Sequence, residues 1–162
     1  MSKENLPVTN AIRVLREHRV AWTDHPYAYE ERGGTAVSAR ELRVDEHACI
    51  KTLIMEDDAK RPMVVLMHGD REVSTKNLAR AIGVKSVQPC APDVADRHSG
   101  YQVGGTSPFG TRRAMPIYVQ RTIADLRYLY VNGGRRGYLV GMPPAELIRV
   151  LRPILVDMAT AD

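Results

Sequence analysis

The sequence has little of several features that would assign it to a particular class of protein. Its two cysteines, Cys49 and Cys90, form neither a Cys-x-x-Cys pair nor a Cys/His group, so neither a disulfide framework nor a zinc site is indicated. We expect both to be core or surface thiols rather than nucleophiles. No run approaches the roughly 20 apolar residues that span a bilayer, and the first ten residues lack the apolar segment of a secretory signal. We therefore expect a cytoplasmic protein in a reduced compartment, with no membrane partner.

Repeats, low-complexity tracts and linkers are also lacking. A chain of 162 residues that is 44% hydrophobic can bury a proper core, so we expect one domain over residues 1–162. Acidic residues become scarce toward the end: residues 1–96 hold 14 Lys and Arg against 15 Asp and Glu, whereas residues 97–152 hold 9 Arg against 2 acids. This excess favours a phosphate-bearing partner, because the arginine fork matches phosphate oxygens. A solvated basic face is an alternative of equal weight.

Hydrophobic periodicity predicts helices and strands that interleave without a regular βαβ period. Helices are expected over residues 8–18, 35–44, 74–83, 91–98 and 143–155. Strands are expected over residues 48–55 and 62–69, which form a hairpin, and over residues 115–120, 126–134 and 136–142. We therefore predict a mixed α/β (α+β) fold in which helices pack outside a mixed β-sheet.

Several helix ends carry recognisable signals. Thr9 is a candidate cap for the first helix and Ser74 for the third, which we expect to end at Gly83. Ser38 and Glu41 have the spacing of a capping box in the second helix. The last helix has a proline at its start.

Lys51 lies in the middle of an apolar run, ACIKTLIM, where a strand would present apolar or neutral groups on at least one face. A solvated lysine on a strand with one wet face is the more frequent explanation. The functional interpretation is an ammonium that faces a cleft and holds an anion, a carbonyl or a developing oxyanion.

Two glycine-rich segments follow in the basic part of the chain. The first, GYQVGGTSPFGTRR at residues 100–113, is named the glycine loop here; its glycines allow close backbone approach to a ligand, and Thr106 and Ser107 add hydroxyls. Its spacing matches neither a Walker A motif nor a dinucleotide-binding fingerprint. The second, VNGGRRG at residues 131–137, is expected to be a hairpin turn because of Asn132-Gly133, or a second pocket wall if it meets the glycine loop.

These residues resemble a known family. The segments IKTLI, GYQVGGTSPFGTRR and LYVNGGRRGYLVGMPPAELIRVL, in this order and at these separations, resemble the YbaK/EbsC family of aminoacyl-tRNA deacylases, which is related to the editing domain of bacterial prolyl-tRNA synthetases. The resemblance extends from residue 10 to residue 155 and is greatest to the free-standing branch that removes cysteine mischarged onto tRNA(Pro). It implies a partly barrel-like mixed sheet, and neither a metal, a cofactor nor an enzyme nucleophile.

The resemblance also implies roles for particular residues. The family's catalytic lysine corresponds to Lys51, with Gly104 beside it at the reacting ester. Its pocket tyrosine corresponds to Tyr27, or to Tyr29 if the alignment shifts. The remaining substrate-binding positions correspond to Gly105, Thr106, Ser107, Asn132 and Gly133, although Asn132 stands where a serine is frequent and Thr106 can alter the pocket size. Apart from the resemblance, the arginine excess in residues 97–152 leads us to expect contacts with tRNA phosphates from Arg112, Arg113, Arg135 and Arg136.

Three functions are compatible with this sequence. The first is a trans-editing deacylase that clears cysteine from tRNA(Pro), with the substrate thiol as nucleophile and prolyl-tRNA synthetase as a possible partner. The second is a deacylase of the same fold for Ala-tRNA(Pro) or another small aminoacyl-tRNA, since one methylene in a pocket is worth only about 1–3 kcal/mol. The third is a non-catalytic adaptor on tRNA or a synthetase, which would not need both Lys51 and the glycine loop.

Overall fold

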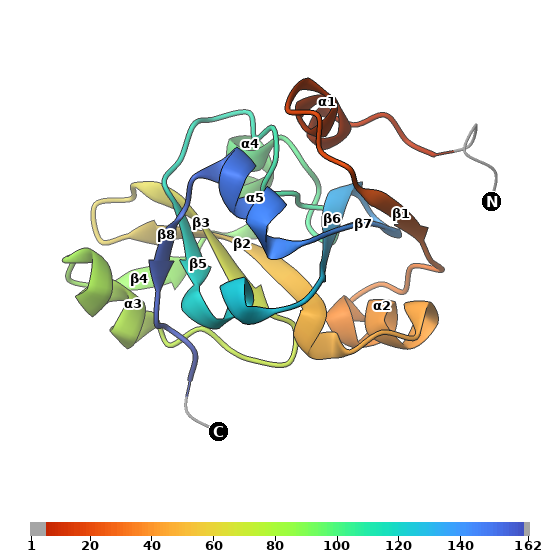
Figure 1. The fold of residues 1–162 in the computed structure, drawn as a ribbon. Coiled ribbons are helices and arrows are strands. Elements are labelled where there is room, and N and C mark those ends of the chain that lie inside the picture. Colours follow the sequence, from red (N-terminus) through yellow and green to blue (C-terminus); the bar gives the residue numbers. More distant parts are fainter. Residues whose placement is uncertain (1–5, 161–162) are drawn as a thin grey trace.

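The computed structural model describes residues 6–160, which form a mixed β-sheet with helices around it (Figure 1). The α-helices are α1 (Asn10–Glu17), α2 (Gly34–Leu42), α3 (Thr75–Ile82), α4 (Pro92–Ser99) and α5 (Pro144–Leu151). The strands are β1 (Thr23–Pro26), β2 (Cys49–Asp57), β3 (Pro62–His68), β4 (Val87–Pro89), β5 (Ile117–Gln120), β6 (Leu129–Arg135), β7 (Tyr138–Met142) and β8 (Ile154–Val156). Short 3₁₀ helices, η2 (Glu46–Ala48) and η3 (Arg121–Asp125), lie between these elements. The mixed α/β fold expected from the sequence is confirmed. Within residues 6–160, no helix has the length and apolar character needed to cross a membrane.

Strand β2 is the branching point of the sheet. The strand order is β1-β7-β6-β2-β3-β5-β8, with parallel pairing of β2 with β6, β3 with β5 and β5 with β8. Two strands share the edge of β2 that lies away from β3. Strand β6 pairs with the first two residues of β2, and β4 pairs antiparallel with residues 55–57 of β2. Among the described residues, no strand therefore pairs with Lys51, Thr52 or Leu53 on that side. This opening in the sheet lies at the residue that the sequence marks as a candidate catalytic group.

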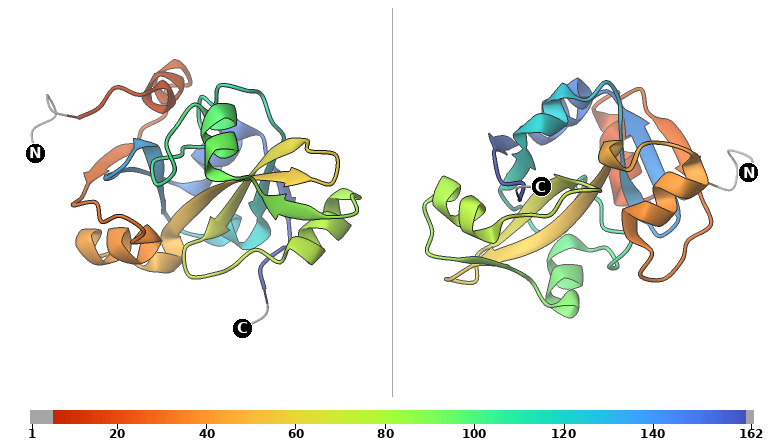
Figure 2. Two further views of the ribbon diagram at one scale, coloured as in Figure 1. Left: turned by 180° about the vertical axis from the view of Figure 1, so that it is seen from behind. Right: turned by 90° about the horizontal axis from the view of Figure 1, so that it is seen from below.

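Alternation along β2 and β3 divides the core into two clusters. Ile50, Ile54, Val64 and Leu66 belong to the larger cluster, which also contains buried side chains of α1, α4 and α5. The residues that alternate with these along β2 and β3, including Met55, Val65 and Met67, face the smaller cluster beneath α3. Successive side chains of a strand point to opposite faces of the sheet, and all seven residues of β3 are buried. Figure 2 shows α4 and α3 beside the β2 and β3 strands that separate the two clusters.

Helix ends agree with the sequence where a side-chain cap is present. Thr9 caps α1 by accepting a hydrogen bond from the Ile12 amide, and Ser74 caps α3 in the same way. The predicted capping box of α2 is wrong: this helix begins one residue earlier, without a side-chain cap, and the buried Ser38 hydroxyl donates to the Thr35 carbonyl inside the helix.

The predicted last helix is four residues too long. Helix α5 ends at Leu151, Arg152 adopts a left-handed conformation, and Ile154–Val156 is a strand rather than helix. Pro153 explains the difference, since a proline disfavours helical conformation in the residue before it and cannot donate a backbone hydrogen bond.

The hairpin expected within residues 131–137 is present between β6 and β7, but its turn lies four residues later than Asn132-Gly133 predicted. Strand β6 continues to Arg135, with an irregularity in register between Asn132 and Arg135, and the turn is formed by Arg136 and Gly137. Glycine is needed at position 133 for packing instead, because a Cβ there would come within 2.6 Å of the Tyr138 ring.

Candidate functional site

Lys51 lies at the opening in β2, on the face of the sheet that carries Met67 and Met55. Its side chain is 21% exposed, and its Nζ donates to Glu72 Oε1 at 3.2 Å. The Glu72 side chain is 81% exposed, and an ion pair with such a solvated partner is weak. The lysine can therefore exchange Glu72 for another anionic or carbonyl group at low cost. Its tip points toward Glu72 in the β3–α3 connection.

The glycine loop is anchored at both ends. Arg112 and Arg113 donate backbone hydrogen bonds to the Ser99 and His98 carbonyls at the end of α4. Inside the loop, the buried Tyr101 hydroxyl donates to the Phe109 carbonyl, and burial raises the pKa of Tyr101 to about 12. The loop is therefore a fixed element of the fold rather than a loose surface turn.

The tip of the glycine loop meets the second glycine segment. Asn132 Nδ2 donates to the Gly104 carbonyl at 3.3 Å, and Arg136 Nε donates to the Val103 carbonyl at 2.9 Å. Gly105 is buried, and a Cβ on it would lie 2.7 Å from the Arg136 backbone nitrogen. Only glycine permits this approach, so the glycine loop and the second glycine segment are in direct contact. These two contacting segments are named the walls here.

Asn132 links these walls to Lys51. The last pair between the parallel strands β2 and β6 is Ile50 with Val131. Lys51 and Asn132 are the next residues of the two strands, so they share one face of the sheet, opposite to the face of Ile50 and Val131. Asn132 Oδ1 also accepts hydrogen bonds from the backbone nitrogens of Gly134 and Arg135. The neighbouring Thr52 Oγ1 is buried and has no hydrogen-bond partner within the described part of the chain.

Two hydroxyls of the glycine loop differ in what they offer a ligand. Ser107 is fully buried, and its Oγ accepts from the Phe109 amide at 3.2 Å. Thr106 is half-buried, and among the described residues its hydroxyl makes only a long contact of 3.5 Å with the Gln102 carbonyl. Ser107 thus fixes the turn, while the Thr106 hydroxyl is the freer of the two.

Both candidate tyrosines lie near these walls. The Tyr27 amide donates to the Gly137 carbonyl, and burial raises the pKa of its hydroxyl, with smaller contributions from Tyr29 and Cys49. The Tyr29 ring lies under the Arg136 guanidinium, 5.2 Å from its centroid, and its hydroxyl approaches the α-carbon of Gly104 closely enough that a Cβ there would lie 2.6 Å away. Tyr27 thus lies against the β6–β7 turn at Gly137, and Tyr29 lies toward the glycine loop.

The thiols offer no nucleophile at neutral pH. Cys49 and Cys90 are buried and free, and burial raises their pKa values to about 11 and about 12. Within residues 6–160, no group of three or more His, Cys, Asp or Glu side chains is arranged to hold a metal ion.

The predicted tRNA-binding arginines fall into two pairs on neighbouring segments. Arg112 and Arg113 are exposed at the base of the glycine loop, and Arg135 is exposed at the end of β6. Arg136 is half-buried because it braces the glycine loop. Three of the four guanidinium groups are thus open to solvent.

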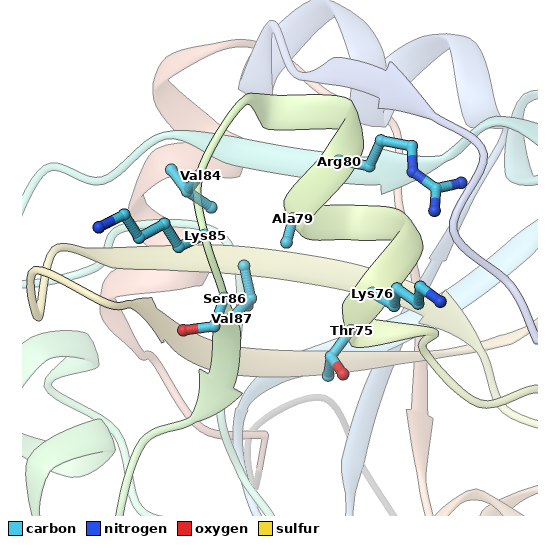
Figure 3. A pocket seen from close by; sticks show the side chains of 8 residues that line it. All are labelled: Thr75, Lys76, Ala79, Arg80, Val84, Lys85, Ser86 and Val87. Carbon is cyan, nitrogen blue, oxygen red and sulfur yellow. The ribbon is translucent and has the colours of Figure 1, made fainter.

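An open pocket of about 410 Å³ lies elsewhere, between α3 and the segment that leads into β4 (Figure 3). Lys76 and Arg80 extend from the helix and Lys85 from the segment, over a floor that includes Ala79 and Val87. Val87 pairs with Asp57 at the far end of β2 from Lys51. This pocket contains none of the predicted site residues.

Comparison with known proteins identifies the family. A family model described as the aminoacyl-tRNA editing domain matches residues 30–150. The chain belongs to this family. The editing-domain chain is 26% identical over 161 residues to the Enterococcus faecalis protein named "Putative Cys-tRNA(Pro)/Cys-tRNA(Cys) deacylase EbsC", covering 99% of this chain and 98% of that protein.

Two further relatives place the editing domain in context. It is 31% identical over 101 residues to the proline–tRNA ligase of Syntrophotalea carbinolica, covering 56% of this chain and 18% of that enzyme. A crystal structure titled as a "putative trans-editing enzyme for prolyl tRNA synthetase" has the same fold, with a TM-score of 0.80 at 17% identity over 96% of this chain and 100% of that chain. The predictions that the chain belongs to this family and is an enzyme, an aminoacyl-tRNA deacylase, are confirmed, and the adaptor alternative is set aside.

Some features of the site were not predicted from the sequence. These are the ion pair of Lys51 with Glu72, the contact between Asn132 and Gly104, and the placement of Tyr29 under Arg136. Each joins residues distant in the chain, and the periodicity and spacing of a single sequence do not signal such contacts. The meeting of the two glycine segments was raised as a possibility, and the structure shows it.

Proposed function

We propose that this editing domain is a trans-editing deacylase that removes cysteine from mischarged tRNA(Pro). The observation that carries the proposal is the position of Lys51 at the opening in β2, one residue past the last β2–β6 pair and next to Asn132, which bonds to Gly104. The relative named as a Cys-tRNA(Pro)/Cys-tRNA(Cys) deacylase, which aligns over almost the whole chain, supports this choice of substrate.

In this proposal, the walls formed by the two glycine segments seat the terminal ribose and its ester, and Lys51 moves from Glu72 to the ester. An ammonium near the carbonyl stabilises the negative charge that develops on oxygen during attack. Thr106 contacts the substrate with its hydroxyl, and Gly105, Ser107 and Gly133 shape the pocket. Tyr27 closes it on the side of the β6–β7 turn.

The nucleophile is the substrate's own thiolate. It attacks the ester carbonyl carbon, the bond from that carbon to the ribose oxygen breaks, and the ribose oxygen takes up a proton equivalent to the one that the thiol lost. The product is a cyclic thioester of cysteine, which water later opens to free cysteine. This route fits a site whose own thiols are buried with raised pKa values, because positioning alone then supplies much of the rate.

The test is single-turnover deacylation of cysteinyl- and S-methylcysteinyl-tRNA(Pro) under identical conditions, with the first product identified by mass. S-methylcysteine cannot form a thiolate, so its ester should bind and react very slowly. Comparable rates, with free amino acid as the direct product, would contradict the proposal and favour attack by a water held between Lys51 and the glycine loop. Alanine released as fast as cysteine would favour the second candidate, a deacylase for Ala-tRNA(Pro) or another small aminoacyl-tRNA.

The exposed arginines are proposed to hold tRNA phosphates. Arg112, Arg113 and Arg135 are solvent-exposed beside the glycine loop, where the acceptor stem would approach. Because a domain of this size has little surface for reading the anticodon, we assign specificity for tRNA(Pro) to a complex with prolyl-tRNA synthetase. Co-elution of the two proteins with and without tRNA(Pro) tests this partner.

A further inference from the structure

A group of aromatic and hydroxyl side chains occupies the outer part of the sheet face that carries Lys51. It consists of Thr23, His25, Tyr128 and Tyr130, named the aromatic cluster here. Thr23 is exposed and the three rings are half-buried, so solvent reaches all four side chains. None of them has a role in the deacylation proposed above.

Direct contacts hold the aromatic cluster together. The Thr23 hydroxyl lies 2.7 Å from both His25 Nε2 and the Tyr128 hydroxyl. The Tyr130 ring makes edge contacts with His25 and Tyr128, at centroid distances of 4.9 Å and 5.5 Å. The rings are therefore fixed before any ligand binds, which reduces the entropy that binding would cost.

Gly141 forms the floor of the aromatic cluster. A Cβ at this position would come within 2.6 Å of both Thr23 Oγ1 and a Tyr128 ring carbon, and within 3.0 Å of His25 Nε2. The absence of a side chain lets these groups converge over the strand. Any larger residue at position 141 would displace them.

Strand register places the aromatic cluster beside Lys51. Thr23, Gly141, Tyr130 and Cys49 form one row across β1, β7, β6 and β2, so they lie on the same face of the sheet. Lys51 follows Cys49 on this face two residues further along β2, a rise of about 7 Å. Asp24, between Thr23 and His25 on β1, belongs to the other face of the sheet, where it accepts hydrogen bonds from Trp22 Nε1 and the Tyr138 hydroxyl.

We propose that the aromatic cluster is a stacking platform for the unpaired 3′-terminal bases of tRNA, with Tyr130 as the main contact. The inference rests on the proposed function: an ester on the terminal ribose at Lys51 requires the preceding unpaired nucleotides to lie over neighbouring surface. Tyrosine faces stack on any base and tolerate sequence variation. Burial lowers the pKa of His25, which the nearby Asp24 partly opposes, so this ring is uncharged near neutral pH and supports stacking.

A binding cycle tests the platform independently of turnover. The probe is an acceptor-stem RNA hairpin that carries no amino acid and is labelled at its 5′ end. It has either its normal unpaired 3′ end or an abasic nucleotide immediately before the terminal nucleotide. Fluorescence anisotropy gives Kd for each probe with the native protein, Tyr130→Ala and the matched control Tyr130→Phe. Tyr128→Ala serves as a second variant should Tyr130→Ala fail to fold, which circular dichroism would show.

The abasic probe should bind the native protein about 5- to 150-fold more weakly, the range expected for one lost stacking contact. Tyr130→Ala should weaken the normal probe by a similar factor but should not further weaken the abasic probe, because each change removes the same contact. Tyr130→Phe should stay within about twofold of the native protein, since it keeps the ring. Equal Kd values for the two probes, or losses that multiply, would overturn the platform. If the native protein shows this binding pattern but does not deacylate Cys-tRNA(Pro), the proposed deacylation alone is contradicted.

Discussion

The Asn132 side chain should support both the stability of the domain and the position of the glycine loop. It is 9% exposed, accepts hydrogen bonds from Gly134 N at 2.7 Å and Arg135 N at 3.0 Å, and donates to the Gly104 carbonyl at 3.3 Å. Each intramolecular hydrogen bond contributes about 1 kcal/mol net, and a buried group left without a partner costs more. Arg135 is exposed, so water can replace the hydrogen bond that its backbone nitrogen would lose. We therefore expect Asn132→Ala to lower the free energy of unfolding by about 2–3 kcal/mol.

For a domain of this size, that loss corresponds to a fall in Tm of about 5–10 °C. Asn132→Asp separates the two roles, because it keeps the acceptor for Gly134 and Arg135 but replaces the donor to Gly104 with a carboxylate oxygen. It should lose less stability than Asn132→Ala and still reduce deacylation. Urea unfolding and deacylation rates measure the two effects. An unfolding free energy within about 0.5 kcal/mol of the native value for Asn132→Ala would refute this account of the loop contact.

Three further predictions follow from single features. Arg112→Ala with Arg113→Ala should weaken tRNA binding at low salt and reduce the slope of log K against log salt by roughly 1–2, and an unchanged slope would identify these residues as a solvated face. Gly105→Ala should cost about 1–3 kcal/mol of stability by overpacking, because its Cβ would lie 2.7 Å from the backbone nitrogen of Arg136; a chemical-unfolding midpoint equal to that of the native protein would argue against the close approach. Burial lowers the pKa of His68, so the stability that its neutral form contributes should be fully present above pH 6.5 and should be lost as the pH falls below that value and through the folded pKa. Unfolding free energies measured over a pH series should therefore fall less steeply on the acid side for His68→Asn than for the native protein, and identical profiles would contradict this assignment.

The parts of the fold that the sequence predicts are those with a local physical signal. The caps at Thr9 and Ser74 are confirmed, because each donor and acceptor lies within three residues. The capping box at Ser38 failed because that residue lies inside a helix and donates to its own backbone. The hairpin expected in residues 131–137 is confirmed, but its turn is at Arg136-Gly137, because the Asn132 side chain is hydrogen-bonded to the irregular end of β6 and to Gly104.

The candidate site is less accessible to sequence reasoning because its contacts depend on strand register. A single sequence marks Lys51 as an unusual cation and the glycine loop as a region of close approach, but it does not show that β2 runs parallel to β6 with Ile50 opposite Val131. That pairing brings Lys51 and Asn132 to one face. It also places Tyr130 in the row of Cys49, so the aromatic cluster emerges only from the folded sheet.

The role of Lys51 is the central claim, and single-turnover deacylation of Cys-tRNA(Pro) by Lys51→Ala tests it most directly. Glu72→Gln is the matched control, because it removes the same ion pair while keeping the ammonium. We predict that Lys51→Ala folds, as judged by circular dichroism and its unfolding transition, and loses deacylation, whereas Glu72→Gln retains at least native activity. Native turnover by folded Lys51→Ala would contradict the account.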